Sequence, residues 1–348
     1  MTDETLRVAC IGFGKMGMLH AALANGLSRS KLTALADPAG FLPDMLKQQK
    51  PDLAVYRDHE ALLANEQIDA VFITTPNSLH VPACQACCDK RIPFFVEKPL
   101  SNTAAEAWPL VESLRKQPLT NMVGYVYRYY ETFAKARELL AGNPLGKLIY
   151  LKAAMYVSQL FREGKGWRYD PKTSGGGVLI SQNSHLIDTL VWMFGPVEWV
   201  SGQVMSWYST EVDDFCHSYL AFKNGLTGYM DTSWSARHYR LIDMRIDVQG
   251  ENGTLAVSED DVKIFLDDAA GSLPAGWTEW RKPDLYRGVE IDMGIPAFTL
   301  QDEAFLKAAA TGEILESDVE SAYHVQQIID AIYESSKHNG QQVYTNRK

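Results

Sequence analysis

The chain has 348 residues, enough for about two domains, and its hydrophobic fraction of 46% can fill sizeable cores. The net charge of −10, without a basic patch, argues against a nucleic-acid partner. Because no apolar run is long enough to span a membrane and the first residues lack a signal-peptide pattern, we expect a cytoplasmic protein with no membrane partner.

A strand followed by a glycine-rich turn opens the first domain. Leu6 to Ile11 is rich in β-formers and leads into Gly12-Phe13-Gly14-Lys15-Met16-Gly17, after which a helical pattern begins. The glycines allow a tight turn and close approach of the backbone to a pyrophosphate, and the helix start offers free N–H groups to the phosphates. We therefore predict a dinucleotide site formed by residues 12–17.

A carboxylate follows the second predicted strand. Leu32 to Ala36 ends in Asp37, which lies 20 residues past Gly17, the expected place for a group that holds the ribose hydroxyls. Since a carboxylate repels a 2′-phosphate and no arginine follows it closely, we expect NAD rather than NADP. The alternative for Asp37 is a turn residue before Pro38.

Strands and helices then alternate up to about residue 124. The predicted strands are Ala54 to Tyr56, Asp69 to Thr74, Ile92 to Val96 and Thr120 to Gly124. This alternation predicts a parallel sheet with helices on both faces, and hence a Rossmann domain over residues 1–124.

Two segments at strand ends carry polar groups. In Thr75-Pro76-Asn77-Ser78-Leu79-His80, Asn77 and His80 could both face the cofactor. The alternative is that Asn77 caps the following helix and His80 packs at its start. Glu97-Lys98-Pro99 follows the strand ending at Val96, where open α/β sheets bind ligands. A lysine there can polarise a substrate oxygen or relay a proton; the alternative is a surface lysine.

Five cysteines show no convincing metal framework. Cys84 and Cys87 have C-x-x-C spacing, but they fall on an apparent helix without a second pair. We expect reduced thiols in packing roles and no metal, with a redox or metal role as the alternative. The cysteines are Cys10, Cys84, Cys87, Cys88 and Cys216.

Long strand-like runs dominate residues 125–348, which we assign to one substrate-binding and oligomerisation domain. Turn signals such as Asn224-Gly225 separate the runs, so we predict an α+β domain with a large, mainly antiparallel open sheet. The predicted strands are Lys147 to Val157, Val197 to Trp207, Asp214 to Phe222, Thr227 to Ser235 and Leu241 to Gln249; the predicted helices are Tyr129 to Ala141, Val178 to Phe194, Phe298 to Ala310 and Val319 to His338.

The helix predicted after the glycine triplet Gly175-Gly176-Gly177 carries a polar face. Ser181, Gln182, His185 and Asp188 share it at helical spacing, without lysine or glutamate. A histidine near neutral pKa is suited to take a hydroxyl proton as a hydride leaves the same carbon. The alternative for His185 is a structural role.

These motifs together resemble the Gfo/Idh/MocA oxidoreductase family along nearly the whole chain. The matching residues are Gly12-x-Gly14-x-x-Gly17, Thr75-Pro76-Asn77-x-x-His80, Glu97-Lys98-Pro99, Trp167-Arg168, Gly175-Gly176-Gly177, His185-x-x-Asp188 and the run Gly225 to Trp234. The resemblance implies a nicotinamide cofactor, a sugar, cyclitol or related substrate, and a homodimer or homotetramer formed through the open sheet.

The same resemblance implies roles for individual residues. Lys98 would contact substrate and tune proton transfer, and His185 would be the general base in oxidation and the general acid in reduction. Thr75, Pro76, Asn77, His80, Glu97, Lys98, Trp167 and Arg168 would contribute to the cofactor site. Substrate contacts would come from Lys98, Tyr125, Tyr127, Arg128, Tyr156, Arg168, Ser181, Gln182 and His185.

The chain departs from the family pattern at two positions. Ser181 stands where family dehydrogenases usually carry aspartate, and serine cannot stabilise a protonated His185 by charge. Asn183 stands where the family often has glycine, which narrows the space near the cofactor.

The predicted activity is hydride transfer between NAD(P) and a secondary hydroxyl or ketone of a sugar, cyclitol or sugar derivative. One alternative keeps bound NAD for transient internal redox that enables elimination, epimerisation or glycoside cleavage. The other is a non-catalytic sugar or NAD sensor on a dehydrogenase fold.

Overall fold

The computed structural model describes residues 5–345 and divides into two compact units. Unit 1 comprises Met1–Tyr125 and Gly288–Tyr323, and unit 2 comprises Val126–Arg287 and His324–Lys348. The sequence prediction divided the chain once, at residue 124. The structure differs in that the segment 288–323 returns to unit 1, because its apolar helix packs against the helix that follows the glycine turn.

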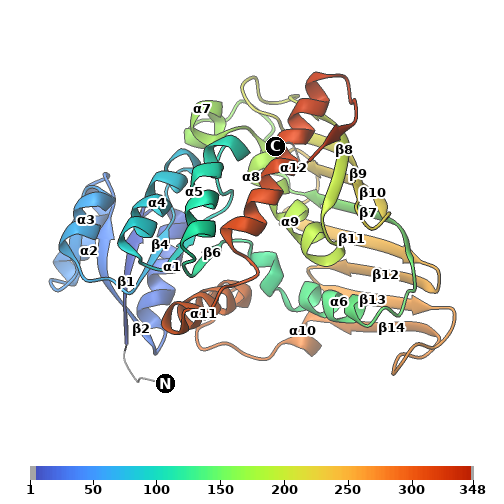
Figure 1. Ribbon diagram of the computed structural model, residues 1–348, viewed down its shortest axis with the longest axis horizontal. Helices are drawn as coiled ribbons and strands as arrows, with labels where there is room; N and C mark the ends of the chain where they lie inside the picture. The colour runs from blue at the N-terminus through green and yellow to red at the C-terminus, as the bar shows by residue number, and fades with distance from the viewer. Residues whose placement is uncertain (1–4, 346–348) are drawn as a thin grey trace. The chain divides into compact units, whose positions relative to one another are not determined.

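Unit 1 is built on a parallel sheet in the order β3-β2-β1-β4-β5-β6 (Figure 1). Strands β4, β5 and β6 are buried along their whole length and β1 over its last four residues, as expected for a parallel sheet covered by helices, and this confirms the predicted Rossmann fold. They are β1 (Leu6–Ile11), β2 (Ser30–Ala36), β3 (Ala54–Tyr56), β4 (Ala70–Ile73), β5 (Phe94–Val96) and β6 (Asn121–Val123).

The helices of unit 1 form two contacting groups. Helix α1 packs on β1, β2, β4 and α11, whereas α4 packs on β4, β5, α3 and α5. Side chains cap two of them: Asp58 accepts from the Ala61 N–H, and Thr103 from the Glu106 N–H. The helices are α1 (Lys15–Gly26), α2 (Phe41–Gln49), α3 (His59–Asn65), α4 (His80–Lys90), α5 (Ala104–Lys116) and α11 (Pro296–Thr311), with the 3₁₀ turn η1 (Asn77–Leu79).

Unit 2 contains the predicted large sheet, in the order β14-β13-β12-β11-β7-β10-β9-β8-β15 (Figure 1). All neighbours pair antiparallel except β7 and β10, which run parallel. The strands are β7 (Leu148–Tyr156), β8 (Val197–Met205), β9 (Phe215–Phe222), β10 (Thr227–Ser233), β11 (Asp243–Gly250), β12 (Gly253–Ser258), β13 (Asp261–Leu266), β14 (Gly276–Arg281) and β15 (Val343–Tyr344).

One predicted helix of unit 2 is divided in the structure. The run Val178 to Phe194 forms α8 (Val178–Ser181) and α9 (Asn183–Phe194), separated at Gln182. The other helices are α6 (Glu131–Ala141), α7 (Pro171–Ser174) and α10 (Lys282–Leu285), with the 3₁₀ turns η2 (Val126–Tyr129) and η3 (Trp167–Tyr169). Helix α12 (Val319–Lys337) contains the boundary between the units. Within residues 5–345, no helix has the length and apolar character needed to cross a membrane.

Candidate active site

The glycine turn of unit 1 lies where the chain order in the sheet reverses, between β1 and β4. Gly12 has φ +91°, and a Cβ on it would lie 2.8 Å from the Thr74 carbonyl carbon. A Cβ on Gly17 would lie 2.2 Å from the Gly12 carbonyl oxygen. Only glycine therefore fits at these two positions, and the turn opens at the switch point where doubly wound sheets bind ligands.

The start of α1 is suited to an anion. Its N-cap is Gly14, no side chain caps it, and no acidic residue stands in its first turn. A Cβ on Gly14 would meet nothing within 4 Å, so the backbone borders open space. Free N–H groups and the positive end of the helix dipole beside such a space fit the pyrophosphate of a dinucleotide.

Asp37 is held beside this turn. Its carboxylate accepts the Phe13 N–H at 2.6 Å and the Ala39 N–H at 2.7 Å. A carboxylate has about four acceptor positions, so capacity remains for ribose hydroxyls. The residues present therefore fit a dinucleotide with an unphosphorylated ribose.

His80 connects two loops at the strand ends. Its ring is 1% exposed, with Nδ1 2.7 Å from the Pro99 oxygen and Nε2 2.9 Å from the Thr75 oxygen. Burial lowers the pKa of His80. The ring thus joins the segment after β4 to the carbonyl group of Pro99, the residue after Lys98.

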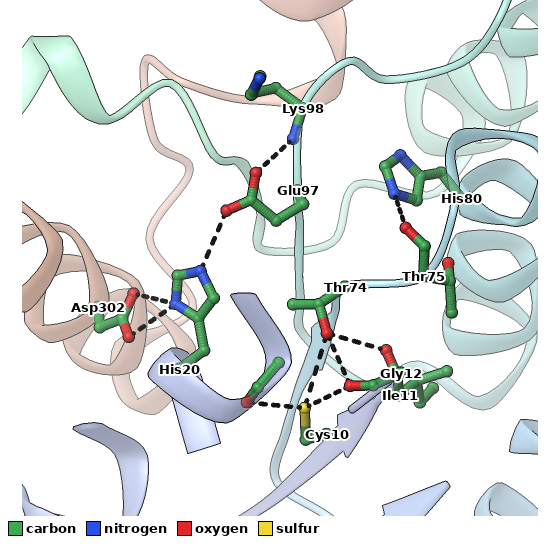
Figure 2. A network of polar contacts seen from close by, with 11 residues as sticks. Cys10, Ile11, Gly12, His20, Thr74, Thr75, His80, Glu97, Lys98 and Asp302 are labelled. Atoms are coloured by element: carbon green, nitrogen blue, oxygen red, sulfur yellow. Dashed lines mark hydrogen bonds and ion pairs between the residues drawn. The ribbon is translucent and has the colours of Figure 1, made fainter. Parts of the chain in front are cut away.

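Lys98 is the second residue after β5. Its backbone N–H donates to Glu97 Oε2 at 3.1 Å, and Figure 2 shows its side chain directed away from His20. Glu97 also contacts His20, which in turn contacts Asp302. The sequence reasoning missed His20 and Asp302; the only signal was a histidine on the buried face of a helix.

In unit 2 the glycine triplet shapes the start of α8. A Cβ on Gly177 would lie 1.8 Å from the Asp213 carbonyl oxygen, so only glycine fits. The Asp213 carboxylate accepts the Gly177 and Leu179 N–H groups, each at 2.8 Å, and the Tyr333 hydroxyl at 2.8 Å. These bonds hold α8, and the helix after it, in place.

His185 lies on α9, which a buried ion pair anchors. The Arg128 guanidinium donates to both Asp188 oxygens, at 2.9 and 2.5 Å, and both side chains are buried. The Tyr127 ring meets the His185 ring edge-on, with centroids 5.3 Å apart. Arg128, expected to bind substrate, is therefore engaged with α9, and Tyr127 packs beside His185.

Two residues that precede His185 in the sequence have buried polar side-chain atoms. Asn183 is fully buried, and neither atom of its amide has a hydrogen-bond partner among the described residues. The amide nitrogen of Gln182, which is 7% exposed, also lacks one among the residues described. Buried polar groups without a hydrogen-bond partner destabilise a protein unless a ligand or water binds to them. Gln182 and Asn183, where α8 ends and α9 begins, are therefore candidate ligand contacts.

The other predicted residues have these surroundings. Tyr125 is 1% exposed, whereas the Trp167 ring is exposed and has the Arg168 guanidinium 5.5 Å from its centroid. The Tyr156 hydroxyl donates to Asp231 at 3.5 Å. All five cysteines are free, and burial raises the pKa values of their thiols. No cluster able to hold a metal occurs within residues 5–345.

Glu259 is a half-buried acid that the sequence reasoning missed. The Tyr127 hydroxyl donates to its Oε1 at 2.5 Å, and burial raises the pKa of Glu259 to about 7. Nothing in the sequence marks it, because 132 residues separate the partners.

Glu259→Gln is expected to change how stability depends on pH. The folded carboxyl keeps its proton up to about pH 7, whereas the unfolded one loses it near 4.5, so wild-type stability falls as pH rises through this window. The glutamine variant has no such group to ionise. Its free energy of unfolding, relative to that of wild type, is therefore expected to rise by about 1–3 kcal/mol between pH 4.5 and pH 8. Thermal unfolding at both pH values measures it, and a gain independent of pH would contradict the burial argument.

Two family models match this chain. One is described as an oxidoreductase family with an NAD-binding Rossmann fold and matches residues 6–125. The other is described as the GFO/IDH/MocA C-terminal domain and matches residues 133–256. The two matches fall on the two predicted domains in the expected order.

Curated relatives and solved structures agree with these matches. D-xylose 1-dehydrogenase (NADP(+)) 2 of Haloferax volcanii is 27% identical, over 91% of this chain and 90% of its own length. Myo-inositol 2-dehydrogenase of Thermotoga maritima is 26% identical, over 76% of this chain and 79% of its own length. The structure of levoglucosan dehydrogenase in complex with NADH has a TM-score of 0.88 at 20% identity, covering 99% of this chain and 100% of that chain. At 20% identity, this structural similarity shows the fold alone.

Proposed function

The chain belongs to the Gfo/Idh/MocA family of NAD(P)-dependent oxidoreductases, and on that premise we propose that it oxidises a secondary hydroxyl of a sugar, cyclitol or sugar derivative, or reduces the matching ketone. The observation that carries the proposal is the uncapped start of α1 behind Gly12 and Gly17, with Asp37 fixed beside it. These are the features a dinucleotide requires.

The first part of the mechanism is cofactor binding. The glycine turn and the N–H groups of α1 would hold the pyrophosphate, and Asp37 would accept the ribose hydroxyls. When bound, the nicotinamide supplies the hydride acceptor or donor. Since Asp37 would repel a 2′-phosphate, we infer a preference for NAD, although one curated relative carries NADP(+) in its name.

The second part is proton transfer at the substrate. We infer that His185 takes the hydroxyl proton in oxidation and returns it in reduction, while Lys98 stabilises the charge that develops on the same oxygen. Ser181 cannot serve as the carboxylate partner usual in family dehydrogenases, so the charge on His185 would be met by other groups. Gln182 and Asn183 would supply polar contacts to the ligand.

We also propose that copies of this chain associate through the open face of the unit 2 sheet into a homodimer or homotetramer. Tyr150 and Tyr229 are 48% and 62% exposed, and Tyr219 packs against Tyr229 and Trp199. Exposed aromatic rings grouped on a sheet are typical of interfaces. Analytical ultracentrifugation at micromolar concentration tests this; a monomer there would contradict it.

We propose a cytoplasmic location on the basis of the cysteines. All five are free, and four are buried in packing positions, as in proteins of a reducing compartment. Cell fractionation tests it.

The experiment for the proposed activity follows NADH at 340 nm. Purified protein is mixed with NAD or NADP and a panel of sugars, cyclitols, sugar acids and nucleotide sugars. Net NADH with one substrate class is the expected result, with a lower rate for NADP because of Asp37. Product formation without net NADH would instead support internal redox chemistry. NAD and sugar binding without any turnover, in either direction, would support a sensor.

A further inference from the structure

A buried cluster of three ionisable side chains lies next to Lys98 in unit 1. His20 comes from α1, Glu97 from the end of β5 and Asp302 from α11 (Figure 2). His20 Nδ1 lies 2.9 Å from each Asp302 oxygen, and its Nε2 lies 3.1 Å from Glu97 Oε1. His20 and Asp302 are completely buried, and Glu97 is 8% exposed. We call these three residues the ion cluster.

The geometry favours a doubly protonated His20. Each ring nitrogen faces a carboxylate oxygen, and a neutral imidazole has only one N–H to donate. A protonated ring that donates to both carboxylates satisfies both contacts and gives the cluster a net charge of −1. Burial alone would lower the pKa of His20, but attraction to Asp302 and hydrogen bonds to both carboxylates raise it to about 10.

Stability does not explain this arrangement. Phe72, Phe95 and Phe298 surround the His20 ring, with centroids 4.8–6.2 Å away. In such an apolar setting a buried ion cluster is often no more stabilising than well-packed hydrophobic residues. A net charge of −1 there also needs a cation nearby.

Lys98, the residue after Glu97, carries a positive charge that helps to lower the pKa of Glu97. Its backbone N–H is bound by Glu97 Oε2, the carboxylate oxygen that His20 does not use, at 3.1 Å. The charges on His20, Lys98 and His80 help to hold the pKa of Glu97 below its usual value against the effect of burial. Lys98 and His80 are the ionisable groups outside the cluster that act on Glu97 within the described part of the chain.

We propose that His20 and Asp302 are positioning residues that act through Glu97, so that the residue directly before Lys98 belongs to a cluster with a fixed net charge of −1 at the pH values where the enzyme works. The inference rests on the proposed function, in which Lys98 stabilises charge on the substrate oxygen. It extends that function to two residues that contact neither cofactor nor substrate.

Asp302→Asn tests the charge without changing the shape. With one carboxylate left, His20 is expected to lose its proton within the neutral range instead of near pH 10. At pH 6 the protonated ring then cancels Glu97, and kcat is expected to fall about tenfold or more. At pH 9 the ring is neutral, Glu97 again carries the net charge, and kcat is expected to return to within about threefold of wild type. The KM for NAD should stay unchanged at both pH values.

Two further variants separate charge from packing. In the double variant His20→Gln/Asp302→Asn, Glu97 alone keeps a net charge of −1, so its pH profile is expected to run parallel to that of wild type. Thr299→Val is the matched control on α11, because it removes a buried hydrogen bond to the Ile291 oxygen without touching the ion cluster. Its loss of activity, if any, should be the same at pH 6 and pH 9.

Nitrogen-15 NMR of the histidine rings gives a readout that does not depend on turnover. Both His20 nitrogens are expected to carry protons from pH 6 to pH 9 in wild type, and to lose one within that range in Asp302→Asn. A neutral His20 in wild type at pH 7 overturns the inference, as does an Asp302→Asn defect of equal size at pH 6 and pH 9. If wild type turns over no substrate, the proposed function fails, and the NMR titration alone decides the inference.

Discussion

His185→Ala is expected to lower kcat about 10³-fold while the dissociation constant for NAD stays within about twofold of wild type. The reason is that the proposed transfer of the hydroxyl proton loses its acceptor, whereas the glycine turn and Asp37, which would hold the dinucleotide, are unchanged. Steady-state kinetics with the preferred substrate and NAD titration by fluorescence measure the two quantities separately.

An exposed histidine provides the control for this variant. His338→Ala removes an imidazole from the surface near the end of the chain and is expected to leave kcat unchanged. If His185→Ala weakens NAD binding and activity to the same extent, or lowers Tm enough to explain the loss, then the ring packed against Tyr127 is structural and the proton acceptor is another group.

Gly14→Ala and Gly17→Ala are expected to fail in different ways. The Gly14 methyl group would enter open space, so Tm should change by no more than a few degrees while the dissociation constant for NAD rises about tenfold or more. The Gly17 methyl group would lie 2.2 Å from the Gly12 oxygen, so the backbone must move and Tm should fall by about 5 °C or more. Differential scanning fluorimetry and NAD titration measure both variants.

Each of these glycine variants serves as the control for the other. A Gly14→Ala protein that binds NAD like wild type would show that the space at the start of α1 does not receive the pyrophosphate. A Gly17→Ala protein with unchanged Tm would show that the turn can relax around an added methyl group.

Local patterns predicted the fold of unit 1 because each signal lies within a few residues. The strand, the glycines and the helix that form the turn are contiguous, and the carboxylate of Asp37 follows its strand directly. The alternation of strands and helices then specifies a parallel sheet without knowledge of any long-range contact. The mainly antiparallel sheet of unit 2 followed in the same way from strand-like runs and turn residues.

The contacts that position the site could not be predicted, because they join residues far apart in the sequence. His20 and Asp302 are separated by 282 positions, and Arg128 and Asp188 by 60. A motif suggests that a polar residue has a role, but not which buried group it faces. The resemblance implied a substrate contact for Arg128, but no local pattern indicated that its guanidinium pairs with Asp188 on α9.

The return of residues 288–323 to unit 1 has a consequence for how this protein is made. Val123, in the last strand of the parallel sheet, donates its N–H to the Ser317 oxygen at 2.7 Å and accepts the Ser317 hydroxyl at the same distance. Asn121 caps the Val319 N–H at 2.7 Å. A ribosome delivers these partners only after the whole of residues 126–287 has been synthesised. The first part of unit 1 is therefore synthesised first, but its edge strand β6 lacks these partners until the chain is almost complete.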